Sequence, residues 1–287
     1  METKLIILCL LGHVLGDYYF QTMKLAHLKT EKIRGLILHG LFYSIPYFII
    51  MLLVEHSNKL ILIFFIIVGI HFIIDSLKFV WIKFLLKKKK NHLLTQKEWL
   101  IYLVDQGLHL LTIVLICFYI GKLDVRPIKT LQDFLIFYRL ESINTLKWIL
   151  LVLFINKPIN ITFGKMFSSY KPIIEEESNN NKENIILHTA TIERNKKNTY
   201  NNSKKLNNEN TDTRKAGAII GFLERALIII FLNIGQYSAI GLILTAKSIA
   251  RYEMISKNQE FGEYYLIGTL TSVLSSVIAY HIIFTWL

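Results

Sequence analysis

The sequence predicts an all-α membrane protein: a polytopic transmembrane bundle of seven or eight helices with a polar, flexible cytoplasmic insert. Of its 287 residues, 53% are hydrophobic, and the mean hydropathy is +0.41, more apolar than a soluble domain needs to fill its core. Apolar stretches of about 20 residues, long enough to cross a bilayer as helices, recur along the chain. Basic residues gather in the connections between these stretches, as they do at the cytoplasmic ends of membrane helices.

The expected membrane helices account for most of the chain. They lie near residues 4–22, 35–54, 59–82, 99–121, 145–163, 216–234 and 263–286. An eighth segment, 235–252, is apolar on one side, so it either spans the bilayer or lies in its interface. The first stretch follows Lys4 as a secretory signal would, but no small-residue cleavage pattern comes after it, so we expect a retained helix.

One segment, residues 164–215, is of a different kind. It is rich in Asn, Lys, Glu and Ser and lacks a sustained apolar period, so it cannot bury enough surface to offset the entropy of ordering. We expect a mobile cytoplasmic loop. The chain then divides into a four-helix half (1–121), a connector with the fifth helix (122–163), the loop (164–215) and the C-terminal helices (216–287).

Three of the first four helices carry an acid and a histidine four residues apart. Residues at this spacing share one face of an α-helix. The remaining helix carries a histidine near its start. The seven residues are His13 and Asp17, His39, His71 and Asp75, and Asp105 and His109.

The charges of the connections predict that these residues lie at one depth. The connection 24–34 contains four basic residues and the connection 83–97 contains six, whereas 55–59 is nearly neutral. The positive-inside rule therefore places the first and third connections in the cytoplasm and the N-terminus outside. All seven residues then fall in the cytoplasmic half of the bilayer, which indicates one polar site.

The cost of burying these acids favours a bound cation. Three aspartates within membrane helices cost about 8 to 10 kcal/mol on insertion scales, which is comparable with the net stability of a domain. Basic residues within the four helices are few, so we expect a divalent metal ion: zinc, with manganese or iron as alternatives. Four histidines and three aspartates exceed the needs of one tetrahedral zinc and suit a two-metal site. The predicted ligands are His13, Asp17, His39, His71, Asp75, Asp105 and His109.

The predicted function is a metal-dependent hydrolase that acts on an ester of a lipid or another membrane-associated molecule. A metal-bound hydroxide supplies the nucleophile in such enzymes, and the aspartates are the expected catalytic residues. The motifs of serine hydrolases and nucleotide-binding enzymes are absent from the sequence. Catalytic roles are predicted for Asp17, Asp75 and Asp105, and substrate-binding roles for Gln21, Gln106, Lys247 and Arg251, the last two as a basic pair suited to a lipid phosphate.

Two other functions fit the same residues. Chains of Asp and His also carry protons or cations through transporters, but the outer half of the first four helices is nearly free of ionisable groups, which favours a local site. A structural metal in a non-catalytic protein is the second alternative. The expected partners are membrane lipids and no nucleic acid, because the run Lys87–Lys90 lacks interleaved aromatic residues. Cys9 and Cys117 lie in apolar segments, where neither a disulfide nor a thiolate site is expected.

Several motifs resemble a bacterial membrane-protein family catalogued as domain of unknown function 3307. They are HVLGDYYFQT (13–22), HFIID (71–75), DQGLH (105–109), GFLERALIII (221–230), GQYSAIGLILTAKSIARYE (235–253) and EYYLIGTLTS (263–272). This resemblance implies a multi-pass protein of the bacterial inner membrane and brings no activity with it. The repeated His and Asp are also loosely similar to predicted membrane-bound metal-dependent hydrolases of the LexA-regulated type. That similarity implies metal-ligand roles for His13, Asp17, His71, Asp75, Asp105 and His109.

Overall fold

The structure, a computed structural model, describes residues 3–55, 57–88, 97–120, 123–140, 142–167 and 217–287. The described chain is almost entirely helical, and its only β-type pairing is one isolated bridge between Val54 and Pro127. It divides into two units, residues 1–169 with 273–287 and residues 170–272, and each unit is described by itself. The predicted loop 164–215 lies outside the described residues except for its first four positions.

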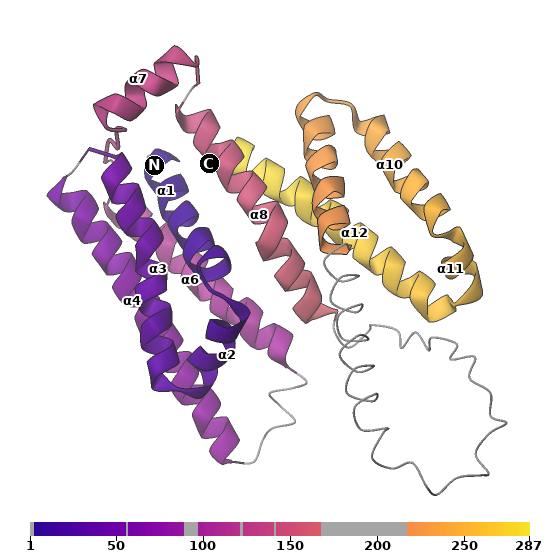
Figure 1. Ribbon diagram of the computed structural model, residues 1–287, viewed down its shortest axis with the longest axis horizontal. Coiled ribbons are helices and arrows are strands. Elements are labelled where there is room, and N and C mark those ends of the chain that lie inside the picture. The colour runs from indigo at the N-terminus through magenta and orange to yellow at the C-terminus, as the bar shows by residue number, and fades with distance from the viewer. Residues whose placement is uncertain (1–2, 56, 89–96, 121–122, 141, 168–216) are drawn as a thin grey trace, which may run out of the picture. The chain divides into compact units, whose positions relative to one another are not determined.

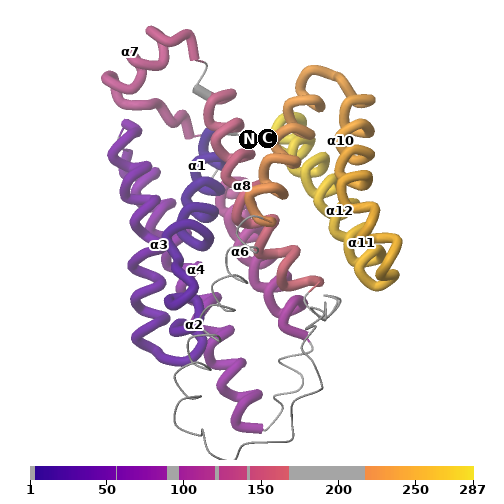
Figure 2. The backbone as a smooth tube through the Cα atoms, turned by 45° about the vertical axis from the view of Figure 1, so that its right-hand side comes forward, coloured from indigo at the N-terminus to yellow at the C-terminus, as the bar shows by residue number. Residues whose placement is uncertain are grey.

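Helix α1 (Thr3–Val14) is the centre of the first unit (Figure 1). It packs against α3 (Ile33–Leu53), α6 (Glu98–Ile120) and α8 (Ser142–Met166), and Figure 2 shows it running among these helices. Apolar residues occupy every side of α1, as expected of a helix with neighbours all round. Its middle is therefore fully enclosed, with Ile7 and Cys9 both 0% exposed.

The first predicted span, 4–22, is broken rather than straight. Helix α1 continues as a π-helical turn, η1 (Leu15–Tyr19), in which the Phe20 N–H donates to the Leu15 carbonyl over 2.8 Å. The chain then bends by 89° into α2 (Met23–Glu31), a helix where a loop was expected. The side chain of Thr22 caps α2 by accepting from the Leu25 N–H over 3.2 Å.

Helix α2 lies against the start of α3. Gly35 permits this contact, because a Cβ atom there would lie 2.3 Å from the Leu28 carbonyl oxygen. The segment that was expected to be a basic cytoplasmic connection is thus part of the bundle, and its side chains can reach the interior.

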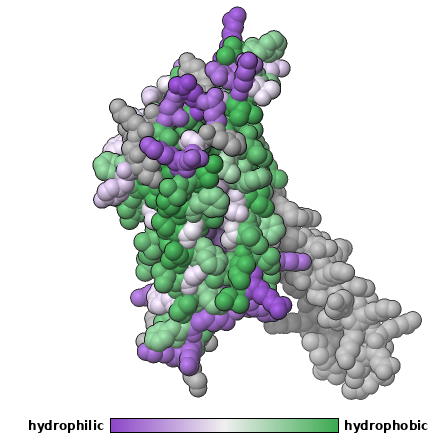
Figure 3. Space-filling view, turned by 90° about the vertical axis from the view of Figure 1, so that its left-hand side faces the viewer, coloured by the Kyte–Doolittle hydropathy of each residue, from purple (hydrophilic) through white to green (hydrophobic). Residues whose placement is uncertain are grey.

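Helix α4 (Asn58–Lys87) packs against α3 and α6. Its 30 residues extend about 45 Å, beyond the roughly 30 Å of a bilayer's hydrocarbon core. On its outer face Phe65 is 69% exposed and Leu77 is 66% exposed. Figure 3 shows hydrophobic side chains over the middle of this side of the molecule and hydrophilic ones at both ends, the pattern of a lipid-facing surface.

The rest of the first unit follows α6. The backbone of 123–128 lies beside the end of α3, where the Glu55 N–H donates to the Arg126 carbonyl over 2.8 Å. A short amphipathic helix, α7 (Lys129–Phe137), which the sequence did not predict, precedes α8. The last turn of the chain, η3 (Ile282–Trp286), packs on α8.

The second unit contains the C-terminal helices. A helix over 217–233 ends at Gly235, whose φ of 71° suits a residue without a side chain. It is followed by α10 (Tyr237–Ala250), α11 (Tyr252–Lys257) and α12 (Gln259–His281), of which residues after 272 belong to the first unit. Lys247 of α10 pairs with Glu224 over 2.5 Å.

The described helices support a multi-pass membrane protein with five or six candidate spans. Five helices are long and apolar enough, and the bent pair formed by α1 and α2 is a sixth. The predicted spans 216–234 and 235–252 correspond to shorter helices, described over 217–233 and Tyr237–Ala250. The expectation of seven or eight spans therefore stays a prediction.

Candidate metal centre

The structure brings the seven predicted ligands together in one buried cluster inside the first unit. They come from α1, η1, α3, α4 and α6, and none is more than 6% exposed. Their spacing along each helix, combined with the packing of these helices around α1, explains why they meet. The members of this His/Asp cluster are His13, Asp17, His39, His71, Asp75, Asp105 and His109.

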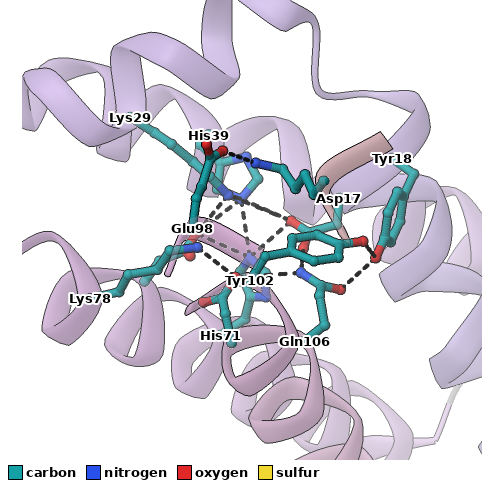
Figure 4. Close-up of polar contacts among 12 residues, drawn as sticks. Asp17, Tyr18, Lys29, His39, His71, Lys78, Glu98, Tyr102 and Gln106 are labelled. Atoms are coloured by element: carbon teal, nitrogen blue, oxygen red, sulfur yellow. Dashed lines mark hydrogen bonds and ion pairs between the residues drawn. The ribbon is translucent and has the colours of Figure 1, made fainter. Parts of the chain in front are cut away.

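The ring nitrogen Nε2 of His39 is the most crowded atom of the cluster (Figure 4). It lies 3.0 Å from Asp75 Oδ2, 3.1 Å from His71 Nε2, 3.2 Å from Asp17 Oδ1 and 3.2 Å from Lys29 Nζ. An imidazole nitrogen offers either one proton or one lone pair. It therefore cannot satisfy all four neighbours. The three neighbours other than the Lys29 ammonium are atoms that can bind a cation.

Three of these atoms have the separations of a tetrahedral metal site. The distances are 3.2 Å between Asp17 Oδ1 and His39 Nε2, 3.1 Å between the two histidine Nε2 atoms, and 3.6 Å between Asp17 Oδ1 and His71 Nε2. A tetrahedral zinc with bonds of about 2.0 to 2.1 Å has its ligand atoms about 3.3 Å apart. Asp17, His39 and His71 thus form a three-ligand group that leaves a fourth position for water.

A second group shares His71 with the first. It consists of His71, Asp75 and His109, whose ligand atoms lie within 4.8 Å of one another. His109 is 2% exposed, and neither of its ring nitrogens has a hydrogen-bond partner among the described residues. A buried imidazole without a partner is costly, so these nitrogens are suited to binding a cation. Because the two groups share His71, they are alternative positions for one ion.

Gln106 connects the remaining residues of the cluster. Its amide nitrogen donates to Asp17 Oδ2 over 2.8 Å, and its oxygen accepts from the Tyr18 hydroxyl over 2.8 Å and lies 3.3 Å from His13 Nε2. The other nitrogen of His13 lies 3.2 Å from the Tyr43 hydroxyl. His13 belongs to neither three-ligand group. It lies beside them, in contact with Gln106 and Tyr43.

Two lysines neutralise the carboxylates of the cluster. Lys29 of α2 lies 3.3 Å from Asp75 Oδ2 and 3.9 Å from Asp17 Oδ1, and Lys78 of α4 lies 2.6 Å from Asp105 Oδ2 (Figure 4). Part of the opposite charge that the buried acids need therefore comes from the chain itself. The sequence analysis did not anticipate this, because α2 folds back and carries Lys29 into the bundle, and because Lys78 stands one turn after Asp75 on α4.

The other predicted residues have different surroundings. Asp105 pairs with Lys78 and is in neither three-ligand group. Gln21 lies in the bend before α2, and its buried Oε1 has no hydrogen-bond partner among the described residues. In the second unit Lys247 pairs with Glu224, whereas the exposed Arg251 contacts Met254 over 3.9 Å. The substrate-binding roles of these residues stay predictions.

Sequence reasoning missed the tyrosines that support the cluster. The Tyr43 ring stacks on His71 with 3.4 Å between centroids, and the Tyr47 hydroxyl donates to the Cys9 carbonyl over 2.9 Å. His39, Tyr43 and Tyr47 recur every four residues on α3, a polar stripe that could have been recognised.

Glycines of α1 and η1 make room for these rings. A Cβ atom on Gly12 would lie 2.6 Å from the Tyr47 ring, and one on Gly16 would lie 2.6 Å from the Tyr43 ring. Small residues four apart allow this kind of close approach between membrane helices. The two glycines therefore set the distance between α1 and the polar face of α3.

Comparison with known proteins finds a family match for the part of the chain that contains the cluster. Residues 5–134 match a family described as Protein of unknown function (DUF3307). No curated protein and no solved structure matches the chain. The C-terminal motifs lie beyond the matched residues, and the similarity to the LexA-regulated hydrolases stays a prediction. The matched residues 5–134 contain the whole His/Asp cluster and both of the lysines that pair with it.

Proposed function

We propose that this protein is a metal-dependent hydrolase of the bacterial inner membrane that acts from the cytoplasmic side on a lipid or membrane-associated ester. The observation that supports the proposal is the group formed by Asp17 Oδ1, His39 Nε2 and His71 Nε2, with separations close to those of a tetrahedral site. The proposed protein has seven or eight transmembrane helices, a number that includes the helices of the second unit.

The residues fit a divalent ion, with zinc first because imidazole and carboxylate donors at tetrahedral spacing suit it. Asp17, His39 and His71 would hold one ion, and His71, Asp75 and His109 form an alternative position for it, because one imidazole nitrogen cannot bind two ions. When bound, the metal lowers the pKa of its water to about 7 and so supplies hydroxide at neutral pH.

The remaining residues orient this site. The Gln106 amide nitrogen donates to Oδ2 of Asp17, and this hydrogen bond orients the carboxylate so that its Oδ1 is directed at His39. Asp75 Oδ2, which lies 3.5 Å from His71 Nε2, is placed to take the proton of the attacking water. Stacking on Tyr43 holds the plane of His71, the residue common to both groups.

Metal analysis of the detergent-purified protein tests the proposal. We expect at least one equivalent of zinc, manganese or iron in the wild type and almost none in His71→Ala, because His71 belongs to both groups. His27→Ala is the matched control, since this α2 histidine is outside the cluster and its side chain is 74% exposed. Less than one equivalent in the wild type, or equal metal in all three proteins, would refute the proposal.

A transport function makes a different prediction for the same purified protein. Ion pairs such as Lys78 with Asp105 inside membrane helices also occur along ion pathways. Liposomes that contain the protein are expected to show no uptake of divalent ions. Uptake that Asp105→Asn abolishes would assign the cluster to transport instead of hydrolysis.

A further inference from the structure

The two lysines of the cluster have no role in holding a metal ion, yet both point their charge into it. Their side chains are 11% exposed for Lys29 and 19% exposed for Lys78. The seven cluster residues are at most 6% exposed. The lysines are thus more exposed than the seven residues of the cluster.

The charge of the cluster changes sign when a metal binds. Asp17, Asp75 and Asp105 carry three negative charges, and Lys29 and Lys78 carry two positive ones, so the net charge with neutral histidines is −1. One divalent ion with a neutral water as its remaining ligand makes it +1. A surplus of positive charge at a buried site is costly unless an anion offsets it.

Metal binding also removes one hydrogen-bond acceptor from Lys29. Its present partners, Asp75 Oδ2 at 3.3 Å and His39 Nε2 at 3.2 Å, belong to candidate metal ligands. An ion bound to His39 Nε2 takes up its lone pair, so Lys29 keeps Asp75 as its near acceptor and at least one of its three N–H donors is free. Lys78 stays on Asp105, which is in neither three-ligand group, and it uses one of its three N–H donors there.

From this charge balance and these freed donors we infer that the substrate is an anionic phosphoester, whose phosphate oxygens are bound by Lys29 and Lys78. The inference rests on the proposed function and selects among its ester substrates, because a neutral acyl ester would leave the surplus charge unmatched. In the reaction a water oxygen bonds to phosphorus and the ester P–O bond breaks. One hydrogen of the water ends on the released alcohol and the other on the phosphate.

Binding of inorganic phosphate tests the inference without any turnover. Isothermal titration of the detergent-purified protein, after its metal content has been measured, is expected to show phosphate binding to the metal-loaded form and none to the chelated form. Lys78→Gln should weaken this binding about 10- to 100-fold, the usual loss for one charge-assisted hydrogen bond. Lys87→Gln, an exposed lysine at the end of the same helix, is the matched control and should bind as the wild type does.

A second variant separates phosphate binding from folding. Lys78→Arg keeps the positive charge beside Asp105 and should retain most of the affinity for phosphate, with unchanged metal content. If Lys78→Gln, Lys78→Arg and Lys87→Gln all bind phosphate like the wild type, Lys78 is not a phosphate ligand and the inference is wrong.

The substrate assays distinguish failure of the inference from failure of the proposed function. A metal-loaded protein that binds no phosphate and cleaves p-nitrophenyl butyrate would overturn the phosphoester and leave the hydrolase standing. A protein that holds no metal would overturn both. Phosphate release from phosphatidate in vesicles, but not from soluble glycerol 3-phosphate, would identify a lipid headgroup as the source, and the reverse result a soluble ester; either supports the inference.

Discussion

Lys78 and Asp105 form the shortest of the ion pairs within the cluster, and their energetics can be separated from metal binding because neither residue is in a three-ligand group. Their attraction offsets the cost of removing a carboxylate from water. If one partner is lost, the other is left as an uncompensated buried charge, and that costs more than the pair contributes.

Replacement of Lys78 by Met is therefore expected to lower the free energy of unfolding by about 3 kcal/mol. Asp105 would keep only a long contact of 3.5 Å with Gln106. The double variant Lys78→Met with Asp105→Asn should recover most of the loss, because no charge is then left unpaired. Denaturant unfolding in micelles measures both, and equal losses in the single and double variants would contradict this account.

At the scale of single residues, the sequence predicted that the histidines and aspartates would lie together. It did not predict that the two lysines would join them. The four-residue spacing of His71 and Asp75 follows directly from helix geometry, so their common face could be read from the chain. The position of Lys29 depends on a bend of 89° in the chain before α2, and no local spacing reveals that bend. Lys78 was visible three residues after Asp75, within reach of the same face.

At the scale of elements, the π-helical turn and the two glycines position the cluster. The turn Leu15–Tyr19 contains Asp17, and a π-turn rotates the residues within it relative to those of the preceding α-helix. His13 and Asp17 consequently have different neighbours, Tyr43 and His39 respectively, although four residues separate them. Spacing predicted that both would be buried but could not predict this division of contacts.

Gly16→Ala is expected to disturb the site through packing alone. The added Cβ would lie 2.6 Å from the Tyr43 ring and 3.2 Å from the Tyr43 Cα, so rotation of the side chain cannot relieve the clash. Overpacking of this kind costs about 1 to 3 kcal/mol, and displacement of Tyr43 should also loosen His71 and weaken metal binding.

Gly107→Ala is the control for this prediction. Gly107 lies on α6 between Asp105 and His109, and a Cβ there would have no heavy atom within 4 Å. Metal titration and thermal unfolding of the two variants provide the comparison. A loss of metal affinity in Gly107→Ala as large as that in Gly16→Ala would show that the effect does not come from Tyr43.

The long helices α3, α4 and α6 were predicted well because each carries a long apolar run. The predicted span 35–54 is observed as Ile33–Leu53, and 99–121 as Glu98–Ile120. Helix α4 was predicted to end at 82 and continues to Lys87, because lysines are good helix formers once the chain has left the hydrocarbon. Helix α7 was not predicted, since its nine residues are too few for a membrane span.

At the scale of the whole molecule, the loop charges predict which side of the membrane the cluster faces. The chain's own cysteines, Cys9 and Cys117, are 0% and 2% exposed and should give little background labelling. In intact bacterial cells a membrane-impermeant maleimide is expected to label Glu55→Cys and not Lys87→Cys. Labelling of Lys87→Cys should require opened cells, and the opposite pattern would place the cluster on the outer side.

Removal of the metal is expected to leave the fold intact. Lys29 and Lys78 already neutralise two of the three acidic charges, so the helices do not depend on an ion to stay together. Far-ultraviolet circular dichroism after chelation should show unchanged helix content, with a melting temperature lowered only by the loss of ligand binding. Unfolding on chelation would instead favour a structural metal.

The contact of Lys29 with Asp75 and His39 bears on how such a site is made in the cell. Membrane insertion takes place while the chain is being synthesised, and an unneutralised acid would resist entry into the lipid. The ammonium group of Lys29 supplies the positive charge beside Asp75 during insertion. Binding of the proposed metal would then be a late exchange of one cation for another on the folded protein.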